Sequence, residues 1–172
     1  KLASLIQQQG GEILLNHKVE NITPKQDEVM VETNNKTLKG KHLVNCAGLY
    51  SDKIAKLTHP HLDIQIIPFR GEYYELKKEK EYLVKNLIYP VPDPAFPFLG
   101  VHFTRMIQGG IEAGPNAVFA FKREGYKNTD IDIKEFSEAL FFSGFRKIAT
   151  KYWKTGWMEM KRSFSKKLFA QS

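Results

Sequence analysis

His102 is a residue of this chain whose type and surroundings suggest catalysis. It lies in a largely apolar run, residues 98–105, that follows three closely spaced prolines within residues 90–94. Such prolines favour a rigid, extended approach, and the pair Gly109-Gly110 predicts a tight return of the chain. Because histidine titrates near neutral pH, it can act as a general base. Such a pattern can build a pocket wall with His102 as its catalytic residue. Taken by itself, it fits an ordinary hairpin with a core histidine better.

Two arginines are candidates for binding a carboxylate group. Arg70 interrupts an otherwise apolar strand pattern, and Arg105 follows His102 by three residues. A guanidinium group presents a planar fork of donors that matches a carboxylate. Tyr73 and Tyr74 alternate on the strand that carries Arg70, so one of them should face the pocket, and we assign Tyr73 to substrate binding. For each arginine, the alternative is an ion pair at the surface.

The turn at Cys46, Ala47 and Gly48 is a candidate for close approach by a ligand. Small residues let a backbone come near a ligand, and a helix that begins after a strand suits an anionic group. Judged by its residues alone, this segment fits a plain strand-to-helix turn better.

Six sequence blocks resemble the FAD-dependent L-2-hydroxyglutarate oxidases and dehydrogenases, which belong to the D-amino-acid-oxidase-like flavoprotein superfamily. The blocks are residues 44–51 (VNCAGLYS), 67–76 (IPFRGEYYEL), 87–94 (LIYPVPDP), 98–105 (FLGVHFTR), 112–117 (EAGPNA) and 120–126 (AFKREGY). The resemblance extends over nearly the whole chain. The proline-rich and AFKREGY blocks are its most specific parts.

This resemblance implies an enzyme that oxidises L-2-hydroxyglutarate to 2-oxoglutarate by hydride transfer to FAD, with oxygen or a quinone as the electron acceptor. It implies that His102 accepts the hydroxyl proton and that the arginines bind a small dicarboxylate. Val19, Ala47 and Gly48 match stretches that lie beside FAD in the family, with the backbone of Val19 at the adenine. The alternatives are related flavoenzymes that act on another 2-hydroxy acid, an amino acid or glycerol 3-phosphate.

The resemblance also implies a part that is missing from the chain. Such flavoproteins begin with a strand, a Gly-x-Gly-x-x-Gly turn and a helix that binds the pyrophosphate. The 172 residues contain no such motif, and Gly10-Gly11 follow a helical pattern instead of a strand. We therefore expect an internal piece of a longer enzyme, which does not retain FAD and is inactive by itself.

The composition is that of an ordinary globular protein, with 42% hydrophobic and 26% charged residues. A single cysteine, Cys46, suits a reducing compartment, so we expect a cytoplasmic protein, and we expect this cysteine to be buried. No apolar run is long enough to span a membrane. His59 and His61 have no acidic or thiol companions, so no metal site is expected.

The formal net charge of +7 comes from residues 146–172, which carry eight basic residues and one acid. Five aromatic residues are interleaved with these charges: Tyr152, Trp153, Trp157, Phe164 and Phe169. This pattern allows a basic binding module or peripheral contact with the inner face of the cell membrane. The alternative, which we prefer, is a helical segment whose aromatic side faces the rest of the enzyme. No nucleic-acid partner is expected, and the exposed aromatic side predicts self-association of the piece.

The elements that must position these residues indicate an α+β protein, with a mixed or antiparallel substrate-domain sheet, flanking helices and a partial FAD-binding α/β domain. We expect three regions: residues 1–58 of the FAD-binding domain, residues 59–128 of the substrate-domain sheet, and a helical segment over 129–172. In the first region the patterns predict strands at 12–15, 18–22, 29–33 and 42–47, and a helix at 53–57 capped by Ser51 or Asp52. Further strands are expected at 66–76, 87–89, 98–104 and 111–113. Helices are expected from about 129 to 141, at 145–153 and at 157–169.

Overall fold

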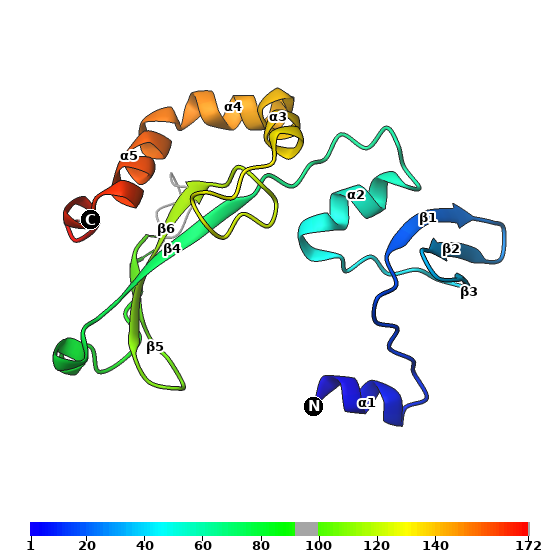
Figure 1. Cartoon of the computed structure of the whole chain (residues 1–172), viewed down its shortest axis with the longest axis horizontal. Coiled ribbons are helices and arrows are strands. Elements are labelled where there is room, and N and C mark those ends of the chain that lie inside the picture. The colour runs from blue at the N-terminus through cyan, green and yellow to red at the C-terminus, as the bar shows by residue number, and fades with distance from the viewer. Residues whose placement is uncertain (92–99, 172) are drawn as a thin grey trace. The chain divides into compact units, whose positions relative to one another are not determined.

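The computed structural model describes residues 1–91 and 100–171. Pro92, Pro94 and Phe98, which belong to the expected rigid loop and strand, lie outside the described residues. The chain divides into two compact units, Lys1–Ile66 and Ile67–Ser172, each described here by itself (Figure 1). Helices combine with two three-stranded antiparallel sheets, so the expected α+β class is confirmed.

The first unit contains a small meander sheet, with short helices before and after it in the chain. Its strands follow the chain order β1-β2-β3. The elements are α1 (Leu2–Gln8), β1 (Val19–Pro24), β2 (Val29–Thr33), β3 (Thr37–Gly40), the 3₁₀ turn η1 (Gly48–Tyr50) and α2 (Ser51–Lys56). The strands expected at 18–22 and 29–33 and the helix expected at 53–57 are therefore present, with boundaries shifted by a few residues.

Two expected strands of this unit, residues 12–15 and 42–47, are wrong, because both segments are irregular. A strand requires a neighbour for its backbone hydrogen bonds, and no such neighbour pairs with 42–47 in the described part of the chain. Val44 is consequently 81% exposed. Cys46, which was expected to be buried, is exposed as well.

The expected side-chain cap of α2 is also wrong. The helix begins at Ser51 without a capping hydrogen bond from a side chain. Asp52 is instead buried, and its carboxylate accepts a hydrogen bond of 3.1 Å from the backbone N–H of Ile66. Asp52 thus ties the helix to the end of the unit.

The second unit is built on a sheet in which β6 lies between β4 and β5. Helices α3, α4 and α5 follow one another beside β4 and β6 (Figure 1). The elements are β4 (Phe69–Glu75), η2 (Lys78–Leu83), β5 (His102–Arg105), β6 (Ile111–Phe119), α3 (Ile133–Phe141), α4 (Ser143–Lys151), α5 (Trp153–Phe164) and α6 (Lys166–Phe169).

The β5–β6 hairpin turns at Gly109-Gly110, as the sequence predicts. Both glycines have positive φ angles, 94° and 89°, which a residue with a Cβ rarely adopts. β6 is longer than the expected 111–113. The strand expected at 87–89 is reduced to a single bridge between Ile88 and Phe103.

The helices break at positions that periodicity alone does not locate. Helix α3 starts after Asp132, whose carboxylate caps the N–H of Glu135 at 3.0 Å, and not at 129 or 130. The helix expected at 157–169 is divided at Ser165, whose hydroxyl caps the N–H of Leu168. Side-chain oxygens that bind free N–H groups are the usual cause of such starts.

An aromatic cluster joins this sheet to helices α3 and α4. Phe119 stacks on Phe145 with ring centroids 4.8 Å apart, and Phe121 meets Phe136 edge-on at 5.2 Å. Aromatic pairs of this geometry add to the free energy of burial. The cluster holds the helical segment against β6.

Candidate functional site

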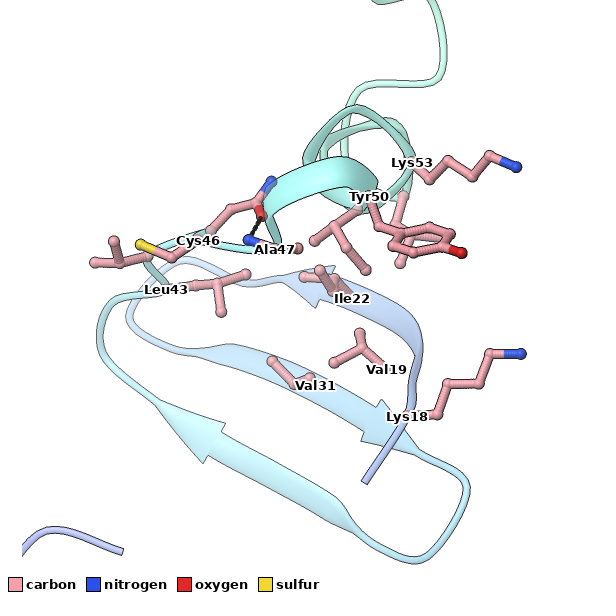
Figure 2. Close-up of a pocket in the computed structure, with 13 residues that line it drawn as sticks. Lys18, Val19, Ile22, Val31, Leu43, Cys46, Ala47, Tyr50 and Lys53 are labelled. Carbon is pink, nitrogen blue, oxygen red and sulfur yellow. Dashed lines mark hydrogen bonds between the residues drawn. The ribbon is translucent and has the colours of Figure 1, made fainter. Parts of the chain in front are cut away.

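Val19 and Ala47, which were expected at a cofactor, line one cavity of the first unit. The cavity has a volume of about 680 Å³, a size typical of ligand sites. Its walls are mainly apolar, and Figure 2 shows Val19, Ile22 and Val31 pointing from the sheet toward the turn at Ala47. The structure therefore brings together two segments separated by 28 positions in the sequence.

Asn45 fixes the turn that carries Ala47 and Gly48. Its amide nitrogen donates to the carbonyl of Ser51 at 2.8 Å, and its side-chain oxygen accepts from the N–H of Ala47 at 3.2 Å. Gly48 has a φ angle of +54°, and a Cβ there would meet nothing within 4 Å. The turn is thus held by its own side chain and opens onto free space. Nothing in the sequence pattern pointed to Asn45.

Two lysines give the cavity a cationic side. Lys18 and Lys53 both line it, and Figure 2 shows their side chains extending to the same side of the view. An apolar pocket with two ammonium groups suits a flat ring joined to a phosphate. The donor set and the open turn therefore fit a dinucleotide such as FAD.

His102 lies at the start of β5 and is only 9% exposed. Its imidazole stacks on Tyr89, with centroids 4.5 Å apart and planes 20° apart, and Tyr73 approaches edge-on at 6.5 Å. Nδ1 lies 3.4 Å from the carbonyl oxygen of Gly100. If Nδ1 donates its proton to this carbonyl, Nε2 keeps a free lone pair. Of the expected substrate-site residues, the structure joins His102 with Tyr73 and adds Tyr89.

Gly114 makes room for this arrangement. It pairs with His102 across the sheet. A Cβ on Gly114 would lie 2.7 Å from Cδ1 of Tyr73 and 2.8 Å from the carbonyl oxygen of Glu72. Only a residue without a Cβ lets Tyr73 lie this close to β6.

Arg70 occupies the opposite face of β4 from Tyr73, because alternate residues of a strand point to opposite faces. Its guanidinium pairs with Glu72 at 2.8 Å and donates to the carbonyl of Lys127 at 3.1 Å and to the side chain of Asn128. The structure therefore gives Arg70 a carboxylate partner within the protein. It does not bring Arg70 to the face that carries His102.

Arg105 lies on the opposite face of β5 from His102 by the same alternation. One of its nitrogens donates to the carbonyl of Val84 at 2.9 Å. The residue lines a separate cavity of about 690 Å³ beside the β5–β6 turn, together with Glu75 and Glu112. Two acidic side chains in this cavity weaken its attraction for an anion.

Glu159 on α5 has a raised pKa. Burial raises the pKa of its carboxyl group, while Arg162, at 2.9 Å, and the N–H of Ala117 act in the opposite direction without cancelling it. The backbone carbonyl of Glu159 accepts from the amide of Asn116 at 2.9 Å. Glu159 thus attaches α5 to β6, and nothing in the sequence pattern indicated this role.

The helices α4 to α6 present an exposed aromatic and basic surface, which we call the α4–α6 surface. Trp153 and Trp157 are 61% and 58% exposed. Nζ of Lys154 lies 5.8 Å from the ring of Trp153, and Nζ of Lys161 lies 5.5 Å from that of Trp157. Lysines beside exposed tryptophans make a surface that is both apolar and cationic.

Neither a metal cluster nor a membrane-spanning helix is found in the described ranges. Residues 1–91 and 100–171 contain no group of three or more His, Cys, Asp or Glu side chains placed to hold a metal ion. Within the same residues, every helix is too short or too polar to cross a bilayer.

Comparison with known proteins gives a consistent result. The profile of a family described as FAD-dependent oxidoreductase matches residues 1–161. An L-2-hydroxyglutarate dehydrogenase from Indibacter alkaliphilus is 57% identical over 173 residues, which cover 100% of this chain and 43% of that protein. One from Escherichia coli K12 is 42% identical over 96% of this chain and 39% of its own length. A mitochondrial L-2-hydroxyglutarate dehydrogenase from Mus musculus is 46% identical over 90% of this chain and 36% of its own.

This chain therefore spans less than half the length of these curated relatives.

Proposed function

Because the chain belongs to the family of FAD-dependent oxidoreductases, we propose that it is part of a longer enzyme that oxidises L-2-hydroxyglutarate to 2-oxoglutarate. The observation that carries the proposal is the similarity of the whole chain to an L-2-hydroxyglutarate dehydrogenase at 57% identity. The cavity of the first unit and the His102 cluster of the second supply the two kinds of site that such an enzyme needs.

Val19, Ala47 and Gly48 are the proposed cofactor-binding residues. Val19 and Ala47 line the cavity, Gly48 leaves an open backbone beside it, and Lys18 and Lys53 offer charge for a phosphate. Bound FAD would supply the hydride acceptor, and the protein supplies orientation and a base. We propose residues 1–58 as part of the FAD-binding domain, and residues 59–128 and 129–172 as the sheet and helical segment of the substrate domain.

His102 is the proposed base. Oxidation of a CH–OH group to a ketone removes a hydride from carbon and a proton from oxygen. With Nδ1 directed at the carbonyl of Gly100, Nε2 is the atom available to accept that hydroxyl proton. The edge of Tyr73 beside His102 forms part of the proposed substrate wall.

Arg105 and Arg70 are the proposed ligands of the substrate carboxylates. Arg105 would bind the substrate carboxylate while keeping its hydrogen bond to the carbonyl of Val84, or would give up that hydrogen bond for the substrate. Arg70 would have to release Glu72 in favour of the substrate carboxylate, or bind both carboxylates at once. These requirements differ, and they make the two arginines separable by mutation.

The test uses the full-length flavoprotein that contains this chain. Under anaerobic conditions L-2-hydroxyglutarate should bleach the flavin absorbance, whereas the D-enantiomer, glycerol 3-phosphate and amino acids should not. His102→Ala should slow the bleaching by roughly 100- to 10,000-fold, the range for a positioned acid–base group. His61→Ala, at an exposed histidine, is the matched control. Reduction by glycerol 3-phosphate or an amino acid instead would favour the related flavoenzymes.

The electron acceptor in this proposal is oxygen or a quinone, and the location is the cytoplasm with peripheral contact at the inner face of the cell membrane. The cationic and aromatic character of the α4–α6 surface supports contact with anionic lipid. Salt-sensitive binding of the full-length protein to anionic vesicles, and its absence with neutral vesicles, tests this contact. The alternative of a basic binding module through residues 146–172 predicts salt-sensitive binding to nucleic acid.

A further inference from the structure

Tyr89 covers one face of the His102 ring. The two rings are nearly parallel, at 20°, with centroids 4.5 Å apart. His102 is 9% exposed whereas Tyr89 is 53% exposed, so the tyrosine shields the imidazole from solvent. Nothing in the sequence pattern indicated a role for Tyr89.

Tyr89 is attached to β5 through the backbone of its neighbour Ile88, and its hydroxyl also approaches this strand. The preceding residue, Ile88, exchanges two backbone hydrogen bonds with Phe103, of 3.0 and 2.9 Å. The hydroxyl of Tyr89 lies 3.4 Å from Oγ1 of Thr104, which shares a face of β5 with His102. The backbone bridge thus holds the ring over His102, whereas the hydroxyl contact is long for a hydrogen bond and adds little.

This arrangement restricts the imidazole. Tyr89 occupies one ring face, Tyr73 approaches from a second direction, and Nδ1 faces the carbonyl of Gly100. A rotation of the imidazole about its Cβ–Cγ bond would break the stack and move Nδ1 away from that carbonyl. Within the described residues Nδ1 is the ring nitrogen with a hydrogen-bond partner, and Nε2 is the nitrogen proposed to meet the substrate.

We propose that Tyr89 is a positioning residue that fixes the orientation of the His102 imidazole through ring stacking. This inference rests on the proposed role of His102 as the proton acceptor. Misplacing a catalytic group by about 1 Å can cost about 100-fold in rate. The ring of Tyr89 should therefore matter for turnover, and its hydroxyl should matter little.

Two substitutions in the full-length flavoprotein separate the ring from the hydroxyl. Tyr89→Leu removes the aromatic stack and keeps an apolar side chain, whereas Tyr89→Phe keeps the stack. Tyr82→Leu, at an exposed tyrosine of η2, is the matched control. We expect Tyr89→Leu to lower kcat by about 100-fold with KM for L-2-hydroxyglutarate changed by no more than about threefold, and Tyr89→Phe to stay close to wild type.

A second readout does not depend on the reaction. In histidine-labelled protein, the ring protons of His102, assigned by comparison with His102→Gln, should shift in Tyr89→Leu because the ring current of the tyrosine is lost. They should remain in place in Tyr89→Phe. Unchanged His102 resonances in Tyr89→Leu would overturn the inference, as would a loss of kcat in Tyr89→Phe equal to that in Tyr89→Leu.

The two proposals fail in different ways. Full turnover in His102→Ala would remove His102 as the base, and the positioning of its ring by Tyr89 would then be decided by the resonances alone. Slow turnover in His102→Ala combined with wild-type kcat in Tyr89→Leu would keep the base and remove the positioning role.

Discussion

At the scale of single residues, Arg70 either stabilises the fold through Glu72 or binds a substrate carboxylate, and mutation can separate these two roles. Its guanidinium pairs with Glu72 and holds the segment at Lys127 and Asn128, and its side chain is 13% exposed. Arg70→Ala leaves the carboxylate of Glu72 without this partner. We expect a loss of about 2 kcal/mol, below the range for fully buried pairs, and hence a lower melting temperature.

The control for this prediction is Arg105→Ala. Arg105 is exposed and donates to a single carbonyl, so its loss should change the melting temperature little. If Arg70→Lys raises KM for L-2-hydroxyglutarate without lowering the melting temperature, Arg70 binds the substrate carboxylate. If Arg105→Ala raises KM, the carboxylate role belongs to Arg105.

Glu159 makes stability depend on pH. Burial raises its pKa in the folded chain above the ordinary value of 4.5, so the folded chain binds more protons than the unfolded chain between the two values. Its contribution to stability is fully present below 4.5 and is lost as the pH rises through the folded pKa. Glu159→Gln should remove this dependence, and the variant should melt higher than wild type at pH 7 but not at pH 4.

Thermal melts of both proteins across this pH range provide the measurement. Glu79→Gln, at an exposed position of η2, is the control and should follow wild type throughout. A constant difference between Glu159→Gln and wild type at every pH would contradict the prediction.

At the scale of the elements, the packing of β4 against β6 depends on Gly114. A Cβ there would lie 2.8 Å from a backbone oxygen, which cannot move without shifting β4. Gly114→Ala should destabilise the protein by about 1–3 kcal/mol, as overpacking does. It should also lower kcat, because Tyr73 would be displaced from His102.

Gly156 provides the matched control for this change. It lies within α5, and a Cβ there would meet nothing within 4 Å. Gly156→Ala should therefore raise stability by up to about 1 kcal/mol, since alanine is the better helix former. If the two variants changed the melting temperature relative to wild type by the same amount and in the same direction, the steric explanation would be wrong.

The α4–α6 surface should cause the isolated 172-residue chain to associate. Trp153 and Trp157 are one helical turn apart, and both are more than half exposed. Light scattering should detect oligomers of the chain, and replacing both tryptophans with serine should shift them toward the monomer. Tyr82→Ser is the control at a distant exposed aromatic. A strictly monomeric wild-type chain at high concentration would refute this expectation.

At the scale of the whole molecule, cofactor binding should require more than these residues. The cavity at Val19 and Ala47 offers apolar walls and two lysines, but the chain contains no Gly-x-Gly-x-x-Gly turn for a pyrophosphate. The isolated chain should therefore be colourless after desalting, while the full-length flavoprotein should carry close to one FAD. A visible spectrum with flavin at one equivalent per isolated chain would disprove this.

Much of the local structure follows from the sequence. The alternation around residues 29–33 and 66–76, the pair Gly109-Gly110 and the helical spacing from Ile133 to Phe141 each locate an element, because these signals act between neighbouring residues. The six family-like blocks also identified the flavoprotein family, which the match over residues 1–161 confirms.

The sequence failed where an element depends on a distant partner. Residues 42–47 have the composition of a strand, but they remain irregular because backbone pairing requires a neighbouring strand that the described residues do not supply. Ser165 divides a helix that the apolar spacing alone would continue, since its hydroxyl caps the next one.

Residue types alone predicted the candidates for chemistry: His102 as a base, Arg70 and Arg105 as cations, and small residues at a turn. Only the tertiary structure decided their neighbours. Tertiary contacts put Tyr73 and Tyr89 against His102 and brought Lys127 and Asn128 to Arg70. The physical reason is that side-chain chemistry is a property of each residue, whereas register and pairing are set by contacts between residues far apart in the chain.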